Sequence, residues 1–454
     1  MAFRKSSVLE DSNLLLDEMC DGPRLSVDGP KSHKDIQEWA HHTVKMLGNE
    51  RCDAFRGLGD LELHVTCRWA GVGGMIIALK YIKKALEDVL QIPVKIRIHS
   101  VGDWDPSCQW MLTFFEPDHL FSNADDEFEH ALVKEMANKQ IKYSEMVNSG
   151  HMQKEVAIGK FKRFCEQVAK RFVPSSGAQC KLCPPGQKCL VVPACAADSR
   201  PGVLWMELAS PPCTPWSMMG SRMQWLCPSQ LSVLLWGMSL HHCTPNILLL
   251  EEVPQYDHWF WQTLVGDKMR FQDATLAPIV VGIPCTGERL WLIGNKSDLE
   301  GVRFDTQTLL HTIVRPVEAD PSIWLVASQS QVDAEMNIIN ASGAKLKPHP
   351  RGKRFRPEDC LSDGYANRLH LHRLRGAAER GAFPHLPLAK VDFYYDISQN
   401  PDHTKRPDGL LPRQLTSSLV WAEKKSRPML RLEMWAGQGF HFCLFVFGGM
   451  CGAA

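Results

Sequence analysis

One cysteine of this 454-residue chain stands in a loop that could aim a thiol at a substrate. Cys213 lies in the segment Ser-Pro-Pro-Cys-Thr-Pro-Trp-Ser (210–217), which follows an apolar run at 203–208. Prolines on both sides of Cys213 fix φ and restrict the residues before them, so the loop is pre-shaped. A thiolate held in this way can form a covalent intermediate. The chain has 16 cysteines, and this setting makes Cys213 the candidate nucleophile.

A glycine-rich turn with an acid downstream forms a candidate cofactor site. The turn is Trp-Ala-Gly-Val-Gly-Gly (69–74), between a strand-like and a helix-like segment. Glycines let the backbone approach a ligand closely, and a helix N-terminus favours polar or anionic groups. Asp103 ends the next expected strand, where a carboxylate can bind ribose hydroxyls. The turn alone could be a plain tight turn; the acid favours a nucleoside cofactor. Trp104 could pack on an adenine face or lie in the core.

Three further segments complete a recognisable series. They are Glu-Glu-Val at 251–253, Gly-Ile-Pro-Cys-Thr-Gly-Glu-Arg at 282–289, and Arg-Pro-Met-Leu-Arg-Leu-Glu at 427–433. The acidic strand end, the glycine turn and the cysteine loop complete the series. In their order and residue types, these six segments resemble the motifs of the DNA (cytosine-5) methyltransferase family. In that family the turn reads Phe-x-Gly-x-Gly-Gly, and the nucleophile loop reads Gly-Pro-Pro-Cys-Gln-x-Phe-Ser.

The resemblance implies both a fold and a reaction. The fold is α/β, a Rossmann-like S-adenosylmethionine-dependent methyltransferase sheet with a helical insertion and a smaller target-recognition region. The reaction is methyl transfer from S-adenosylmethionine to C5 of cytosine in double-stranded DNA. Cys213 adds to C6 of the base, Glu251 contacts N3, and Arg289 orients the base and stabilises developing charge. The base must leave the duplex to reach such a pocket.

The same resemblance assigns residues to the two ligands. Those expected to bind the cofactor lie in the turn, at the second strand end and beside the nucleophile: Trp69, Gly71, Gly73, Gly74, Asp103, Trp104 and Pro212. Ser217 and the basic run at 345–356 are expected to contact nucleic acid, the run through Arg351, Lys353, Arg354 and Arg356. A solvated loop or an import signal is the alternative for that run. Arg368, Arg373 and Arg375 extend its positive character.

Several positions depart from the family pattern. Glu252 replaces Asn, Cys285 replaces Gln, and Gly287 replaces the first of two arginines. Beyond the position of Phe440, sequences of the family continue through a Gly-Asn element. This chain has an apolar tail after Phe440 instead, and we expect this tail to be a truncated or altered terminus. Two alternatives therefore remain: a tRNA cytosine-5 methyltransferase, and a catalytically silent DNA-binding relative.

A cysteine series in a Pro/Gly-rich loop forms a candidate metal site. Its spacing is Cys-x2-Cys-x5-Cys-x5-Cys, and its members are Cys180, Cys183, Cys189 and Cys195. Four thiolates could hold a structural zinc ion in a small knuckle. The spacing is not a pair of Cys-x2-Cys hooks, so free thiols in a loop are the alternative.

Hydrophobic patterns predict the elements that position these groups. Alternating segments at 61–65 and 94–98 flank a helical segment at 75–90, which predicts a βαβ unit and a parallel sheet. The charged segment 126–172 shows helical spacing without strand signals and is expected to be an insertion. Further strands are expected at 203–208, 247–250, 279–281 and 290–293.

These elements suggest a division of the chain. We expect a polar lead-in at 1–58 with one helix at about 31–47, and a catalytic cofactor-binding domain at 59–300. The latter includes the helical and cysteine-containing insertion at 126–200. A target-recognition region follows at 301–425, and 426–454 returns to the catalytic domain with an atypical apolar C-terminus.

Composition limits the class of protein. The chain has 51 basic and 51 acidic residues, so nucleic acid must be met by a local basic patch. The first residues show no signal-peptide pattern, and the most apolar window, 231–250, contains His241 and His242. We therefore expect a buried helix and strand in that window, no membrane span, and an intracellular, nuclear protein with reduced thiols.

Overall fold

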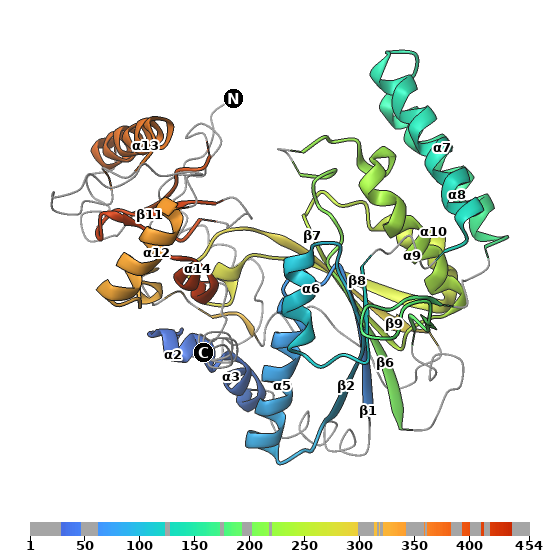
Figure 1. Cartoon of the computed structure of the whole chain (residues 1–454), viewed down its shortest axis with the longest axis horizontal. Coiled ribbons are helices and arrows are strands. Elements are labelled where there is room, and N and C mark those ends of the chain that lie inside the picture. The colour runs from blue at the N-terminus through green and yellow to red at the C-terminus, as the bar shows by residue number, and fades with distance from the viewer. Residues whose placement is uncertain are drawn as a thin grey trace, which may run out of the picture. The chain divides into compact units, whose positions relative to one another are not determined.

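The computed structural model divides into two compact units, each described by itself. The residues that the structure describes are 29–46, 62–122, 128–172, 177–192, 202–217, 220–297, 313–315, 317, 321–341, 358, 361–382, 393–399, 410–412 and 418–437. One unit comprises Ala40–Leu276 and Glu288–Leu309, and we call it the sheet unit. The other comprises Met1–Trp39, Ala277–Gly287 and Leu310–Ala454. Their elements can be followed in Figure 1.

A seven-stranded sheet in the order β3-β2-β1-β6-β7-β9-β8 forms the core of the sheet unit. Strand β9 runs antiparallel to its neighbours β7 and β8, and the other neighbouring pairs are parallel. Counted in chain order within the sheet, the arrangement is 3-2-1-4-5-7-6. This is the sheet of the Rossmann-like methyltransferase fold, so the expected α/β fold class is confirmed. The strands are β1 (Glu62–Arg68), β2 (Lys95–Gly102), β3 (His119–Phe121), β6 (Val203–Ala209), β7 (Ile247–Glu252), β8 (Met269–Leu276) and β9 (Arg289–Lys296).

The predicted βαβ unit is present in this sheet, beside the edge strand β3. Strands β1 and β2 pair in parallel, and α5 (Gly74–Leu90) connects them. The helix buries Ile76, Ile77 and Leu86, which lie on one face because their spacing matches the helical repeat. Both strands extend beyond the predicted ends, so that β1 leads directly into Trp69.

The apolar window at 231–250 forms a buried helix and a strand, as predicted. Helix α9 (Leu231–His242) is apolar on nearly all sides and buries residues around its whole circumference, including Leu234, Trp236 and Met238. A helix of this kind is stable only when it is covered on every side. Strand β7 follows and pairs with β6. None of the helices in the described part of the chain is long and apolar enough to cross a membrane.

The charged segment after β3 forms the expected helical insertion. Helices α7 (His130–Asn148) and α8 (Lys154–Ala169) follow each other closely in the chain and pack as a pair (Figure 1). Gln140 of α7 is buried, and its Nε2 donates hydrogen bonds to the carbonyl oxygens of Trp225 (2.9 Å) and Cys227 (2.7 Å). These bonds connect the insertion to the segment that follows the nucleophile loop.

Two predictions of local structure were wrong. The segment expected to be a strand at 279–281 forms a 3-10 helix, η7 (Pro278–Val280). Pro278 has no backbone N–H to donate to a neighbouring strand, and Gly282, at φ 79°, turns the chain. The apolar run therefore does not form a β-strand. The single helix expected near 31–47 is two helices, α2 (His33–Gln37) and α3 (Trp39–Met46), because Glu38 leaves the helical conformation.

The second unit has a small sheet and its own core. Strands β10 (Tyr394–Asp396), β11 (Val420–Ala422) and β12 (Arg427–Pro428) pair antiparallel in that order. Its longer helices are α12 (Gln329–Ala341) and α13 (Asp363–Ala382), and α14 (Arg431–Gly437) follows β12. One core cluster comprises Val332, Leu361, Leu369, Phe393, Tyr395, Ile397, Leu419, Trp421 and Leu430.

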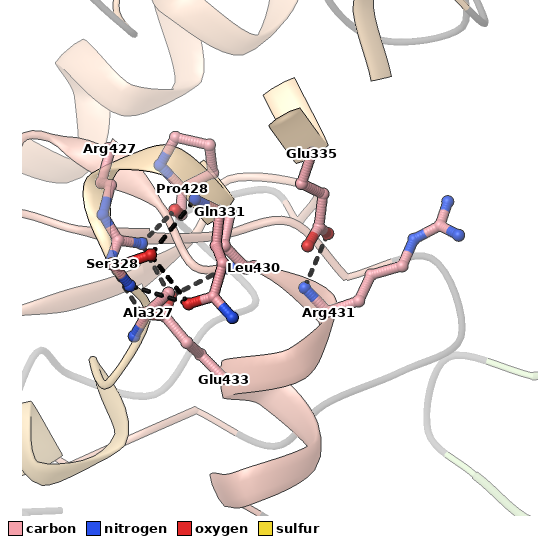
Figure 2. A network of polar contacts seen from close by, with 9 residues as sticks. All are labelled: Ala327, Ser328, Gln331, Glu335, Arg427, Pro428, Leu430, Arg431 and Glu433. Atoms are coloured by element: carbon pink, nitrogen blue, oxygen red, sulfur yellow. Dashed lines mark hydrogen bonds and ion pairs between the residues drawn. The ribbon is translucent and has the colours of Figure 1, made fainter. Parts of the chain in front are cut away.

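The segment at 427–433 contains a buried ion pair (Figure 2). Arg427 donates from both terminal nitrogens to the two carboxylate oxygens of Glu433, each at 2.7 Å. Glu433 also accepts hydrogen bonds from the backbone N–H groups of Leu430 (3.0 Å) and Ala327 (3.2 Å). The pair therefore fastens β12 and α14 to the residues before α12, and its role in this unit is structural.

Shorter elements complete the description. They are α6 (Pro106–Thr113), α10 (Trp259–Val265), β4 (Ala178–Gln179), β5 (Lys188–Cys189), η4 (Gln224–Leu226), η5 (Pro228–Gln230), η6 (Gly266–Lys268) and η8 (Pro321–Trp324).

Candidate functional site

The loop after β6 presents Cys213 to solvent on an ordered turn. The N–H of Ser210 donates to the carbonyl oxygen of Arg68 (3.3 Å), which fixes the start of the loop beside the end of β1. The carbonyl oxygen of Cys213 accepts from the N–H groups of Trp216 and Ser217, both at 3.0 Å. Cys213 is exposed while Trp216 is buried. The loop thus has a fixed base and an accessible thiol, as the prolines predicted.

Two buried side chains hold the loop on either side of Cys213. The Nε2 of Gln230, which is buried, donates to the carbonyl oxygen of Pro212 at 2.8 Å. The ring of Trp216 packs edge-on against Trp225 and Tyr256, with both pairs of ring centroids 5.0 Å apart. Sequence reasoning missed Gln230, because nothing near position 230 indicates a contact with residue 212.

Glu251 and Arg289 lie together at the end of neighbouring strands. Glu251 is near the carboxyl end of β7, Arg289 begins the antiparallel strand β9, and Arg289 Nε forms an ion pair with Glu251 Oε1. Both charges act on the thiol of Cys213, Arg289 lowering its pKa and Glu251 raising it. The three expected catalytic residues therefore lie close enough for the charges of two of them to shift the pKa of the third.

The net effect of the surroundings is to raise the pKa of Cys213. Partial desolvation is the largest cause of the raised pKa, because protein atoms crowd the region around the sulfur. The side chain of Cys213 is nevertheless accessible to solvent. The carboxyl group of Glu252 is the second cause, and Arg289 opposes both. The thiol therefore needs additional positive charge or an acceptor for its proton before it can act as a thiolate near neutral pH.

Glu252 is a buried acid beneath this site. Its side chain is 1% exposed, and its Oε2 accepts a hydrogen bond from the N–H of Val253 (2.8 Å). Its Oε1 has no hydrogen-bond partner in the part of the chain that the structure describes. Burial raises the pKa of Glu252 to about 8, and Glu251 adds to the effect, while Val253 N–H and Arg289 oppose it. Glu252 is thus mostly protonated at neutral pH.

The glycine turn has a left-handed backbone conformation, which favours glycine, at two of its glycines. Gly71 and Gly73 have φ of 56° and 86°, in the left-handed region. A Cβ on Gly73 would lie 2.2 Å from Cε2 of Phe115, whereas one on Gly71 would meet no atom of the described residues within 4 Å. Gly73 is therefore needed for packing, and Gly71 borders open space. Trp69 also has a positive φ, of 49°, and Gly74 begins α5.

Asp103 connects the turn to the end of β2. Its Oδ2 accepts a hydrogen bond from the N–H of Gly71 (2.8 Å), and its Oδ1 accepts one from the N–H of Asp105 (2.9 Å). Trp104 is 76% exposed, so the expectation that it could belong to the core is wrong and its ring face is accessible. The expected cofactor residues that follow β1 and β2 thus lie together at the carboxyl ends of these two strands.

A buried ion pair supports the two strands that carry the turn and the nucleophile loop. Arg68 Nε donates to Glu207 Oε1 at 2.8 Å, and Trp236 Nε1 donates to the same oxygen at 3.0 Å. Thr66 Oγ1 donates to Glu207 Oε2, and these two residues are partners in the β1–β6 register. Sequence reasoning missed this network; the signal was a glutamate inside the apolar strand Val-Leu-Trp-Met-Glu-Leu-Ala.

The structure changes the expected metal-ligand set. Cys180, Cys183 and Cys189 lie together with His119, and the four ligand atoms are within 4.8 Å of one another. Cys195 lies outside the described residues. His119 begins β3 and was not predicted, because it is far from the cysteines in the sequence.

The expected nucleic-acid residues are only partly described. Ser217 lies next to the nucleophile turn, and its Oγ donates to the carbonyl oxygen of Thr214 (3.4 Å). Arg351, Lys353, Arg354 and Arg356 lie outside the residues that the structure describes.

Two of the additional arginines are engaged within the second unit. Arg373 donates to the carboxylates of Glu423 (2.8 Å) and Glu358 (2.6 Å). Arg368 donates to the carbonyl oxygen of Ser398 at 2.9 Å. These interactions neutralise Arg373 and give both side chains a structural role.

Comparisons with known proteins give distant similarities. No family model and no curated protein matches the sequence. The solved structures to which the chain is similar include the methyltransferase EhMeth of Entamoeba histolytica (14% identity, TM-score 0.29, 54% of this chain and 56% of that one). Others are a DNMT2 mutant of Spodoptera frugiperda (15%, 0.28, 54% and 54%) and a candidate DNA modification methyltransferase encoded within a prophage of E. coli (12%, 0.33, 77% and 82%). The chain spans little more than half the length of the first two.

Proposed function

We propose that this chain is a divergent cytosine-5 methyltransferase that transfers a methyl group from S-adenosylmethionine to C5 of cytosine in DNA. One observation carries the proposal: Cys213 is exposed on the loop after β6, and the charges of Glu251 and Arg289 act on its thiol. The exposed nucleophile and its charged partners belong to adjacent strands of a methyltransferase-type sheet.

The position of this site in the sheet supports a ligand-binding role. Strands β1 and β6 are neighbours, but the chain continues from β1 to β2 on one side and from β6 to β7 on the other. Ligands of open α/β sheets bind outside the carboxyl ends of the strands at such a switch point. The glycine turn follows β1, and the nucleophile loop follows β6.

The residues at the ends of β1 and β2 fit a nucleoside. Gly71 borders open space, so a ligand can approach its backbone. Each carboxylate oxygen of Asp103 accepts one backbone hydrogen bond and keeps acceptor capacity for a ribose hydroxyl. The exposed ring of Trp104 can stack on an adenine. When bound there, S-adenosylmethionine supplies an electrophilic methyl group on a sulfonium sulfur.

The proposed chemistry begins with Cys213. Its thiolate adds to C6 of cytosine, forming a C–S bond and making C5 nucleophilic; C5 then takes the methyl group as the sulfonium C–S bond breaks. Loss of the C5 proton to a base and breaking of the C6–S bond restore the ring and the thiolate. In this scheme Glu251 binds the N3 edge of the base, and Arg289 orients Glu251 and offsets the negative charge that develops.

The size of the segment after the sheet supports the choice of DNA as substrate. The expected target-recognition region at 301–425 contributes to a unit with its own core and antiparallel sheet, which offers more surface than a short loop would. A tRNA substrate would use the same thiol chemistry. Glu252 and the raised pKa of Cys213 favour a second candidate, a silent relative that binds DNA without turnover.

Covalent trapping tests the proposal directly. The protein is incubated with S-adenosylmethionine and either duplex DNA or tRNA containing 5-fluorocytosine, and covalent complexes are separated under denaturing conditions. We expect a complex with DNA that Cys213→Ser abolishes and that Cys227→Ser, at a half-buried thiol outside the nucleophile loop, leaves unchanged.

The remaining outcomes separate the alternatives. A complex with tRNA alone would move the substrate to RNA. Cofactor binding by calorimetry without any complex would favour the silent relative. Absence of both cofactor binding and a complex from the folded protein would reject the methyltransferase assignment.

A further inference from the structure

We propose that His119, Cys180, Cys183 and Cys189 bind one structural zinc ion. Their ligand atoms all lie within 4.8 Å of one another, and three of the four come from a single short loop. Cys180 and Cys189 are buried, so the site is shielded from water on two sides. The cluster lies within the sheet unit and is separate from the residues assigned to methyl transfer.

The donor set matches the chemistry of zinc. Three thiolates and one imidazole form a closed tetrahedral set, which is typical of structural zinc sites. Zn–S bonds of about 2.3 Å imply sulfur–sulfur separations of about 3.8 Å in a tetrahedron. The Sγ atoms of Cys183 and Cys189 are 3.4 Å apart, close to that value and far from the length of about 2.05 Å of a disulfide.

The loop is already shaped to hold thiolates. In Cys180-Lys-Leu-Cys183, the N–H of Leu182 donates to Sγ of Cys180 at 3.4 Å. The two-residue strands β4 and β5 pair so that Ala178 is opposite Cys189. A Cβ on Gly177 would lie 2.6 Å from the carbonyl oxygen of Cys189, so only glycine permits this close approach of the two strands.

Among the residues that the structure describes, few make apolar contacts with the loop. The local cluster consists of Phe121, Ala178, Cys180 and Cys189, with Cys183 and Val191 packed against it. Two strands of two residues each are too short to be stable alone, and small folds of this kind commonly depend on a metal or disulfides. A metal ion bound by all four ligands would supply the missing stabilisation.

His119 connects this loop to the main sheet. It lies on β3, the edge strand of the seven-stranded sheet, and the N–H of Lys181 donates to the carbonyl oxygen of Leu120 at 2.8 Å. The Nδ1 atom of His119 is buried and has no hydrogen-bond partner among the described residues. A buried nitrogen without a partner carries a desolvation cost, which coordination of the ring would offset.

Metal content of the purified full-length chain, measured by mass spectrometry of the elements, tests the proposal. We expect one zinc per chain, retained through dialysis and released when the thiols are titrated with a mercurial. His119→Ala and Cys183→Ser should each lower the zinc content at least several-fold. Cys108→Ser, a half-buried thiol outside the cluster, should retain it.

Cys195→Ser distinguishes two possible ligand sets. The structure-based set is His119, Cys180, Cys183 and Cys189, and the four-cysteine set has Cys195 in place of His119. The structure-based set predicts that Cys195→Ser keeps its zinc and His119→Ala loses it. The reverse result, or a wild-type chain that folds with no zinc, would overturn the proposal. A Cys183–Cys189 disulfide in the protein as purified, seen as a mass lower by two hydrogens, would overturn it as well.

Cobalt exchange of the wild-type protein covers the case in which the variants fail to fold. Replacing the bound metal with Co²⁺ should give strong thiolate-to-cobalt charge-transfer absorption and the visible bands of a tetrahedral site. Weak absorption, as expected for octahedral oxygen ligands, would contradict the proposal.

Discussion

Arg289 Nε and Glu251 Oε1 form an ion pair across the antiparallel strands β9 and β7, and both charges act on the thiol of Cys213. The two groups shift the pKa of this thiol in opposite directions. Desolvation and Glu252 are the larger causes of its raised pKa, and the pair adds two opposing contributions. Variants of the pair can reveal these contributions without a nucleic-acid substrate.

Alkylation of Cys213 should respond with opposite sign to the two members of the pair. Arg289→Met removes the positive charge and should slow alkylation by iodoacetamide at pH 8, whereas Glu251→Gln should accelerate it. Each unit of pKa changes the thiolate fraction about tenfold, so we expect changes of up to about that size. The rate is followed at Cys213 by peptide mass spectrometry over a range of pH, with Cys227 as internal control. Equal shifts of the same sign in both variants would show that the pair acts only by holding the structure.

Glu252 should make the protein less stable as pH rises from about 4.5 to about 8. The pKa of Glu252 is raised from 4.5 to about 8, so in this window the folded state keeps a proton that the unfolded state has lost. The unfolded state binds fewer protons, and the stability contributed by this group therefore falls with pH. Glu252→Gln should remove this dependence. The melting temperature of the variant minus that of wild type should therefore increase as pH rises from 5 to 8. Thermal denaturation at several pH values measures the difference, and parallel curves for the two proteins would contradict the assignment.

Cofactor binding should be sensitive to Gly71 and Asp103. Gly71→Ala imposes left-handed strain but meets no atom of the described residues within 4 Å. Gly150→Ala imposes similar strain at φ 74°, likewise with no described neighbour, far along the chain. We expect similar losses of stability, but weaker binding of S-adenosylmethionine only in Gly71→Ala. Asp103→Asn should weaken binding about 10- to 150-fold, because a hydrogen bond to a charged group contributes about 1.5–3 kcal/mol. Calorimetry gives the affinities, and unchanged binding in both variants would place the cofactor elsewhere.

The Arg427–Glu433 pair should be needed for stability and not for cofactor binding. Arg427→Met leaves the Glu433 carboxylate buried without its ion-pair partner, which costs about 3–5 kcal/mol. The double variant Arg427→Met/Glu433→Leu should recover part of this loss, although the backbone N–H groups of Ala327 and Leu430 then lose an acceptor. Chemical denaturation measures both variants. A single variant as stable as wild type would show that the pair in Figure 2 contributes little.

Several parts of the fold and the site could be predicted from local sequence. The alternating segments around α5 predicted the βαβ unit, and the prolines around Cys213 predicted an exposed, fixed loop. These features depend on backbone preferences and on the repeat of apolar residues within a few positions. Strand β8 alternates only at its start, at Met269 and Phe271, because Asp273 interrupts the pattern. The apolar run at 279–281 was misleading because Pro278 cannot join a ladder.

The reactive groups could be identified from the amino-acid sequence alone: the thiol of Cys213, the carboxylates at 251 and 252, the glycine turn and the cysteines of the loop. Which of these groups lie together depends on the packing of distant segments. Strand β9 brings Arg289 within ion-pair distance of Glu251, whose register partner is Trp291, and the β1–β6 register pairs Thr66 with Glu207. The edge strand β3 places His119 beside three cysteines. The physical reason is that such contacts, and the burial that protonates Glu252, arise when strands distant in the chain pack together. Neither local spacing nor residue type contains that information.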